Sequence, residues 1–265
     1  MPIDRSRMPA DGRYSRRKPV PNLDDLMQRV RDLEEENLRL KTEQDMYQAN
    51  LETLVQERTK QWQTTMQNLE RSYDITLEAL GDALDLKNAE VKGHSHRVTL
   101  FTTAISHAMG LPREQIAVIA RGGFLHDIGK MAIPDMILRK PDTLTSDERA
   151  IMQEHPLRGY QMIQKVPFLA EVSEIVYAHH EHFDGSGYPR CLKGKQIPLG
   201  ARIVAVANAL DSITSDLPYR PARSLSAARE EIRAWAGRQF DPDVVGAFLR
   251  IPDDMWEQLR REVES

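Results

Sequence analysis

Between residues 22 and 80 the chain contains neither glycine nor proline. Apolar side chains recur there at alternating intervals of three and four residues, separated by charged ones. This period is the heptad repeat of helices that supercoil around one another. We call the following positions the seam: Leu23, Leu26, Val30, Leu33, Asn37, Leu40, Gln44, Tyr47, Leu51 and Leu54. The pattern predicts one long helix.

The seam admits two interpretations, of which a parallel dimeric coiled coil is favoured because highly charged residues flank it. Asn37 occupies a seam position, where an asparagine fixes the register and the number of strands. The phase slips after Leu54 and resumes from Trp62. In the other interpretation, the helix packs its apolar face on its own domain. We expect a homodimer that forms through residues 23–79.

Residues 1–22 are rich in arginine and proline and lack an apolar period, which predicts a disordered basic arm. A solvated tail is favoured over a nucleic-acid-binding arm. The formal net charge of −4 and the isoelectric point near 6.1 give the chain no general attraction to nucleic acid or to an anionic membrane.

The single cysteine, Cys191, excludes an intrachain disulfide and is typical of a reducing compartment. No apolar run approaches the length of about 18 residues that a membrane span needs. The longest candidate covers residues 203–210, and no apolar segment of a secretory signal follows the basic N-terminus. We expect a cytoplasmic protein without membrane insertion.

From about Leu80 onwards, helical segments of about 12 to 18 residues alternate with short turns that contain glycine and proline. Gly110 is placed to end one helix in a left-handed conformation, and Asp241 followed by Pro242 is typical of a helix start. Strand-like alternation is nearly absent. We predict an all-α fold in which a helical domain, residues 80–265, follows the arm and the coiled coil.

All eight histidines lie between residues 94 and 182. Histidine and carboxylate groups are the ligands that divalent transition metals prefer, so this concentration indicates a metal site. Glu90 and His94 are four residues apart, which on a helix places both on one face. His96 would point away from that face, and His107 is expected to lie against a helix end rather than in the site.

A second group of candidate ligands lies further along the chain. His126 and Asp127 follow an apolar run, with Lys130 four residues after His126. A buried helix that carries these charges must neutralise them or bind something. His155 precedes Pro156 at the start of another predicted helix, where by itself it is typical of a loop residue.

The stretch HHEHFDGSGYP supplies a third group. His179 and His180 would be about 100° apart on a helix, so both reach one site only if it is wide enough for two or three ions. His182 would share a face with His179 and is a reserve ligand. Gly187 and Pro189 then turn the chain sharply.

These motifs occur in a specific order. HDIGK is followed by HP, then by HHEHFDGSGYP, and then by IPLGARIVAVANALDSITSDLPYR. From about Leu80 to about Leu249 the chain resembles the HD-GYP domain, a bacterial branch of the HD phosphohydrolases. The resemblance implies an all-helical HD-domain bundle with two or three iron- or manganese-type ions. It also implies hydrolysis of cyclic di-GMP to the linear dinucleotide pGpG or to GMP.

The same resemblance assigns roles to individual residues. His126, Asp127, His155, His179 and His180 match metal ligands, and Asp127 matches the one that bridges two ions. Glu90 and His94 match the pair associated with a third ion. Lys130 matches the lysine that contacts the scissile phosphate or the leaving oxygen. The GYP loop, Gly187, Tyr188 and Pro189, matches a loop beside the substrate that is also implicated in docking diguanylate cyclases.

Two positions depart from the family pattern. Asn208 stands where the family has an aspartate ligand, so an ion held there gains no charge from this side chain. Leu217 stands where the family has an arginine that faces a substrate phosphate, although Arg220 remains.

Three hypotheses follow. In the favoured one, the domain is a working cyclic di-GMP phosphodiesterase that Asn208 and Leu217 weaken. In the second, it is a dimeric scaffold that engages partners through the GYP loop and the coiled coil. In the third, it hydrolyses another nucleotide. Because no recognisable sensor domain precedes the seam, we expect the regulatory input to come from a separate sensor or response regulator, from an unidentified ligand, or from no source at all.

Overall fold

A computed structural model describes residues 22–87, 93–216 and 220–264. Within these ranges the chain forms helices and no β-strand, and Ala236 and Phe240 form an isolated bridge. The predicted all-α class is confirmed. The chain divides into two compact units, Met1–Arg71 and Ser72–Ser265.

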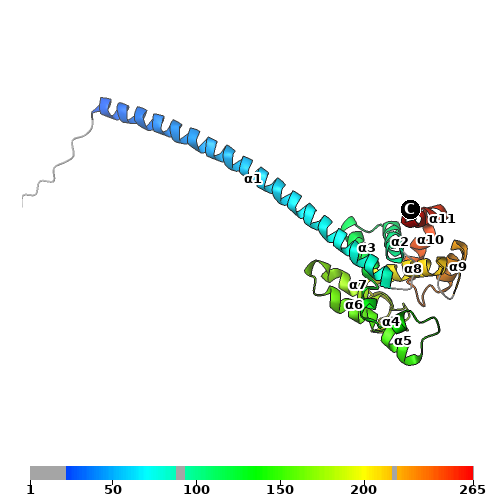
Figure 1. The fold of residues 1–265 in the computed structure, drawn as a ribbon. Helices are drawn as coiled ribbons and strands as arrows, with labels where there is room; N and C mark the ends of the chain where they lie inside the picture. Colours follow the sequence, from blue (N-terminus) through cyan, green and yellow to red (C-terminus); the bar gives the residue numbers. More distant parts are fainter. Residues whose placement is uncertain (1–21, 88–92, 217–219, 265) are drawn as a thin grey trace, which may run out of the picture. The chain divides into compact units, whose positions relative to one another are not determined.

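The first long element is α1, Leu23–Lys87, drawn from blue to cyan in Figure 1. Asn22 caps its start, because the Asn22 Oδ1 atom accepts a hydrogen bond of 2.8 Å from the backbone N–H of Asp25. The seam side chains are exposed, as at Leu33 (60%) and Leu51 (57%). The helix Leu23–Lys87 confirms the predicted long helix. Its apolar seam positions face solvent in the single chain.

The last turns of α1 belong to the second unit. Leu77 and Leu84 are buried there, and Tyr73 stacks on Phe168 with ring centroids 4.1 Å apart. The predicted domain boundary between residues 79 and 80 falls inside this helix. The division into compact units lies earlier, after Arg71.

The rest of the second unit is a bundle of short helices (Figure 1). The α-helices are α2 (His94–Ala108), α3 (Arg113–Leu125), α4 (Asp135–Leu138), α5 (Ser146–Met152), α6 (His155–Ile163), α7 (Ala170–Ala178), α8 (Leu199–Thr214), α9 (Leu225–Ala234), α10 (Pro242–Arg250) and α11 (Asp253–Glu264). In the described part of this unit, 3₁₀ helices join them at η1 (Ile128–Ala132), η2 (Pro167–Leu169) and η3 (Gly194–Gln196).

Two apolar clusters hold this bundle together. In the larger one, Trp256 of α11 packs edge-on against Phe101 of α2 and tilted against Phe248 of α10, with centroid distances of 5.4 Å in both pairs. The smaller cluster surrounds Phe124 and Val176, from α3 and α7. Because α3 and α7 pack together and also contact α8, they connect the two clusters and carry the ends at which the histidines lie.

Both predicted helix boundaries are confirmed. Gly110 follows α2 with φ of 73°, and its N–H donates to the carbonyl oxygen of His107. Asp241 caps α10 by accepting a hydrogen bond from the N–H of Asp243. Among the described residues, none of the helices has the length and apolar character needed to cross a bilayer.

Candidate metal centre

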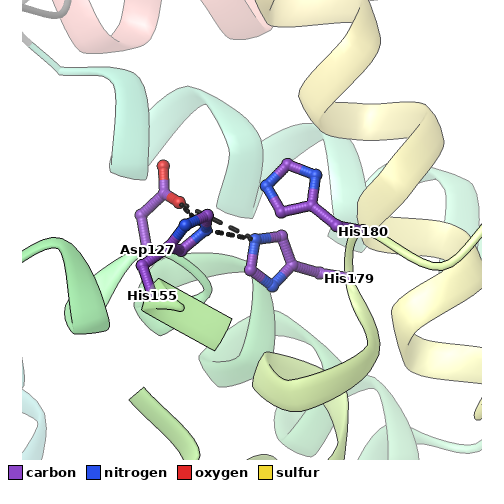
Figure 2. Close-up of side chains that lie close together, drawn as sticks. All are labelled: Asp127, His155, His179 and His180. Carbon is purple, nitrogen blue, oxygen red and sulfur yellow. Dashed lines mark hydrogen bonds and ion pairs between the residues drawn. The ribbon is translucent and has the colours of Figure 1, made fainter. Parts of the chain in front are cut away.

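Six side chains from distant parts of the second unit meet in two groups that share Asp127. One group contains Asp127, His155, His179 and His180, and the other contains His94, His126 and Asp127. Within each group the ligating atoms lie within 4.8 Å of one another. Figure 2 shows the first group, with the rings of His155 and His179 beside the Asp127 carboxylate.

Three of these histidines are held by the same kind of hydrogen bond, from Nδ1 to a backbone carbonyl group. His126 directly follows α3, His155 follows the end of α5, and His179 directly follows α7. Each Nδ1 lies 2.7 Å from the carbonyl oxygen of the residue three positions earlier, namely Gly123, Met152 and Val176. The last carbonyl groups of a helix lack partners inside the helix. They therefore accept the Nδ1–H bond, and the lone pair stays on Nε2, which points into the cluster.

The Asp127 carboxylate lies between the two groups. Its Oδ1 is 3.3 Å from Nε2 of His155 and 3.7 Å from Nε2 of His179. Its Oδ2 is 3.2 Å from Nε2 of His126, and 2.7 Å from Nζ of Lys130. One oxygen therefore faces each histidine group, which is the arrangement that a carboxylate needs to bridge two ions.

A close backbone approach positions Asp127. A Cβ atom on Gly129 would lie 1.9 Å from the carbonyl oxygen of His155 and 2.5 Å from the backbone nitrogen of Gly159. Only glycine fits there, so η1 contacts the first turn of α6 directly. This contact brings Asp127 beside His155, although the two residues belong to different helical segments.

The donor set suits divalent metal ions. Nε2 of His155 lies 3.2 Å from Nε2 of His179, and Nε2 of His94 lies 3.4 Å from Nε2 of His126. With Nδ1 protonated in each ring, lone pairs face one another at these distances. They repel unless a cation or a proton lies between them, so imidazole and carboxylate groups in this geometry match a transition-metal site.

The electrostatics of the cluster agree with this interpretation. Burial, followed by the neighbouring imidazoles, holds the pKa values of His179 and His180 well below the usual value for histidine. Burial opposes ionisation of Asp127, but His126, Lys130 and His155 outweigh it, so the pKa of Asp127 lies well below its usual range. At neutral pH the two histidines are neutral and the aspartate is charged, which are the forms that ligate metals.

Residues behind His94 were not anticipated as part of the site. The Asp211 Oδ2 atom lies 2.7 Å from Nδ1 of His94, and Arg97 donates from Nε to Asp211 Oδ1 at 2.5 Å. Burial opposes ionisation of Asp211, but His94 and Arg97 outweigh it and lower its pKa. Asp211 therefore holds the His94 ring with Nε2 directed into the cluster.

The GYP loop packs on the cluster through Tyr188. The Tyr188 ring stacks on the His180 ring with centroids 4.8 Å apart, and its backbone N–H donates to the carbonyl oxygen of His180. Burial, followed by the charge of Asp127, raises the pKa of Tyr188. A Cβ on Gly187 would lie 2.2 Å from the backbone nitrogen of His182, so glycine is required there.

A buried carboxylate, that of Glu181, anchors the far side of this loop. Glu181 accepts hydrogen bonds from the backbone N–H groups of Arg190 and Leu192, at 2.7 and 3.0 Å. The Glu181 carboxylate therefore holds the loop, a role that no sequence pattern indicated.

Two arguments from helical faces are wrong. Helix α2 begins at His94, after Gly93 with φ of 81°, so the four-residue spacing from Glu90 does not describe one helix. Glu90 itself lies outside the described residues. Helix α7 ends at Ala178, so His182 does not share a helical face with His179. Its Nδ1 instead lies 3.0 Å from the Ser186 hydroxyl.

The end of α7 at Ala178 also changes the prediction for His179 and His180. Because they do not lie on a helix, the separation of about 100° that called for a wide site does not apply to them. His179 and His180 lie in the turn that follows the helix, with ring centroids 4.2 Å apart, and both belong to one compact group. His96 lies beside Asp82 and Phe124 and outside both groups, as predicted. His107 is exposed and also lies outside both groups.

The remaining predicted site residues have other partners or are not described. Asn208 is half-buried on α8, and its Oδ1 lies 3.5 Å from the Ser212 hydroxyl. Arg220 donates from Nη2 to the Ser212 carbonyl oxygen at 2.6 Å, near the end of α8. Leu217 lies outside the described residues. The roles of Asn208 as a ligand and of Arg220 in substrate binding stay predictions.

The family model described as "HD domain" matches residues 78–244. The chain therefore belongs to the HD domain family, in agreement with the resemblance that the motifs indicated.

Curated relatives share this region. The chain is 38% identical over 191 residues to a protein of Thermotoga maritima named "Cyclic di-GMP phosphodiesterase", covering 71% of this chain and 52% of that protein. It is 38% identical to "Cyclic di-GMP phosphodiesterase response regulator RpfG" of Xanthomonas campestris pv. campestris, covering 70% and 50%. It is 37% identical to "3'3'-cGAMP-specific phosphodiesterase 2" of Vibrio cholerae, covering 66% and 34%. The chain thus spans about half the length of the first two relatives, and less of the third.

Two solved structures have the same fold. The crystal structure of the Vibrio cholerae phosphodiesterase V-cGAP3 superposes with a TM-score of 0.53 at 19% identity, covering 70% of this chain and 52% of that one. Bd1817, an HD-GYP-type protein of Bdellovibrio bacteriovorus, superposes with a TM-score of 0.52 at 20% identity, covering 67% and 62%. At these identities the likeness concerns the fold.

Proposed function

We propose that the second unit is a metal-dependent phosphodiesterase that hydrolyses cyclic di-GMP to pGpG, GMP or both. The observation that carries this proposal is the Asp127 carboxylate, whose two oxygens face separate histidine groups with Lys130 at one side. The names of the relatives from Thermotoga and Xanthomonas support cyclic di-GMP as the substrate.

Two or three iron or manganese ions fit the proposal. When bound, such ions stabilise charge on phosphoryl oxygens and lower the pKa of water. Asp127 belongs to both histidine groups and links them. Glu90 and Asn208 are proposed to complete the ligand set, and Asn208 would offer only a neutral carbonyl oxygen.

The remaining polar groups have roles in binding the substrate. Lys130 is a compact positive charge 2.7 Å from Asp127, suited to balance negative charge on a phosphate or a departing oxygen. Tyr188 shields His180 on the side of the GYP loop. We assign Gly187, Tyr188, Pro189 and Arg220 to the substrate side of the site, and the same loop to contact with a diguanylate cyclase.

The test uses the full chain, purified without oxygen and loaded with Fe(II) or Mn(II). Incubation with cyclic di-GMP, followed by ion-exchange separation of the nucleotides, should yield pGpG or GMP. Asp127→Asn and His126→Ala should remove the activity, whereas His107→Ala, which changes an exposed histidine outside the cluster, should retain it. Fully metallated protein without turnover would contradict the proposal.

A second substrate is favoured by a specific comparison, because one relative is named as specific for 3'3'-cGAMP at 37% identity. Parallel assays with 3'3'-cGAMP and cyclic di-GMP at equal concentrations distinguish the two. A larger kcat/KM for 3'3'-cGAMP would assign the domain to that substrate while leaving the metal centre as described.

We further assign α1 to a parallel homodimer. Its seam leucines are exposed in the single chain, from Leu26 at 44% to Leu23 at 72%. A regular apolar seam on a helix of 65 residues is stabilised when a second copy covers it. The regulatory input is assigned to a separate sensor or response regulator.

A further inference from the structure

The last residue of α1 is bound to the segment that carries Lys130. The Lys87 ammonium lies 2.6 Å from the carbonyl oxygen of Met131 and 3.2 Å from that of Ile133, and it donates a hydrogen bond to each. The Lys87 side chain is 23% exposed, so these bonds are largely shielded from water. Lys87 and this segment belong to the same compact unit. The end of α1 is therefore tied to the chain directly after Lys130.

Both carbonyl groups depend on a donor from outside their own helical segment. In a 3₁₀ helix such as η1, the carbonyl of Met131 would accept from the N–H of residue 134, but that residue is proline and has none. Ile133 follows η1 in an extended conformation, with φ of −84° and ψ of 135°, so its carbonyl leaves the helical pattern. The Lys87 ammonium supplies both hydrogen bonds, and bonds from a charged donor are the stronger kind.

The contact is reciprocal. Arg139, which directly follows α4, donates from Nε to the carbonyl oxygen of Lys87 at 3.1 Å. The last carbonyl groups of a helix lack partners inside it, so this bond stabilises the end of α1. Asp135 adds an ion pair of 3.6 Å to the Lys87 ammonium, but its side chain is largely exposed, so this pair contributes little. The backbone contacts therefore carry the connection.

These contacts hold η1 at one end, and Gly129 holds it at the other by fitting closely against the backbone of α6. Lys130 lies between the two anchors, with its Nζ 2.7 Å from Asp127 Oδ2. A displacement of about 1 Å in a group that acts on the substrate can lower a rate about 100-fold. The position of Lys130 therefore depends on Lys87 as well as on Gly129.

We propose that Lys87 is a positioning residue for the phosphodiester reaction, which acts by fixing Lys130 through the end of η1. This role rests on the proposed function, in which Lys130 balances negative charge on the phosphate or on the departing oxygen. Lys87 lies outside the histidine motifs, at the end of the helix that also carries the seam.

Steady-state kinetics of the full, manganese-loaded chain with cyclic di-GMP test this role. Lys87→Met keeps the apolar stem but removes the ammonium, so it should lower kcat roughly 10- to 100-fold while the metal content stays native. Lys87→Arg, which can still donate to two carbonyl groups, should recover most of kcat. Lys165→Met, which removes an exposed lysine of the same unit, is the matched control and should have native kcat.

A double-mutant cycle separates positioning from general stabilisation. If Lys87 acts through Lys130, Lys87→Met should have little further effect once Lys130→Met is present. A role independent of Lys130 would lower kcat by the same factor in both backgrounds. Equal factors, or native kcat in Lys87→Met, would overturn the proposal.

Hydrogen exchange provides a readout that does not depend on turnover. The backbone N–H of Lys130 donates to Asp127 and that of Ile133 to Lys130, at 2.8 and 3.0 Å. Lys87→Met should speed the exchange of these two amides about tenfold or more and leave that of Val245, in α10, unchanged.

Native exchange rates at Lys130 and Ile133 would contradict the proposal, and they decide the matter if Lys130→Met leaves no turnover to compare. If Lys87→Met does not fold, Lys87→Gln, whose shorter neutral side chain cannot reach both carbonyl groups, takes its place. Faster exchange in a protein whose native form has no turnover would refute the phosphodiesterase and leave Lys87 as the residue that fixes η1.

Discussion

The Asp211 Oδ2 atom lies 2.7 Å from Nδ1 of His94, with both side chains buried. The two residues are 117 positions apart in the chain, and Arg97 balances the aspartate charge from the same side. Since Nδ1 donates to Asp211, the Nε2 lone pair of His94 is available to the metal cluster. Asp211 is therefore a positioning residue, which acts on the cluster through His94.

Asp211→Asn should weaken metal binding about 10- to 100-fold at the group that contains His94, because the uncharged amide holds the imidazole less firmly. It should also destabilise the fold by about 3–5 kcal/mol, since Arg97 loses its buried partner. Metal content after dialysis and urea unfolding measure the two effects. Asp243→Asn, which changes an exposed aspartate, is the control. Native metal content in Asp211→Asn would show that Asp211 does not orient His94.

The sequence allowed the long helix and most of the side chains that gather in the cluster to be predicted, because both leave local patterns. The seam repeats every three or four residues, and the histidines are concentrated in one region. The contact of Arg97 and His94 with Asp211 left no such pattern, since it depends on how α2 packs against α8. Periodicity within one segment carries no information about that packing.

The errors at His94 and His182 have a common cause. A helical face exists only while the helix continues, and α2 begins at His94 whereas α7 ends at Ala178. The cluster uses helix ends, where backbone carbonyls without helical partners can hold imidazoles. Spacing arguments developed for helix interiors therefore fail at this kind of site.

Asn208→Asp should raise the metal content, because it adds a carboxylate where the family pattern has one. If the native domain is a weakened enzyme, turnover of cyclic di-GMP should rise as well. If the native domain binds metal without turnover and the variant restores it, the scaffold hypothesis is supported. Asn50→Asp adds the same charge on α1 and is the control. Equal metal content in Asn208→Asp and the native chain would exclude position 208 as a ligand.

The metal-free protein should lose stability as the pH falls below about 6.5, the ordinary pKa of histidine. His179 and His180 have lowered pKa values in the folded chain, so below this pH the unfolded chain binds more protons than the native one. The free energy of unfolding should be insensitive to these two groups above pH 6.5. Urea midpoints in EDTA from pH 7.5 to 5.5 measure the effect.

His180→Gln should flatten this pH dependence, because the amide does not titrate. The lowered pKa of Asp127 acts in a different window: its contribution to stability is present above the ordinary aspartate value and is lost only in stronger acid, through the native pKa. Identical pH slopes for His180→Gln and the native chain would show that His180 is not held neutral by burial.

Two leucines of α1 provide a matched test of the proposed dimer. Leu40 is a seam position and Leu38 is not, yet both are exposed in the single chain, at 52% and 68%. On an isolated helix, glutamate should have the same small effect at either position. In a coiled coil, Leu40→Glu loses the burial of two leucines, roughly 3–6 kcal/mol per dimer, and places two charges in the seam. Sedimentation equilibrium should therefore find Leu40→Glu monomeric and Leu38→Glu dimeric like the native chain. A dimer that survives Leu40→Glu, or a native chain that is monomeric, would contradict the assignment of α1.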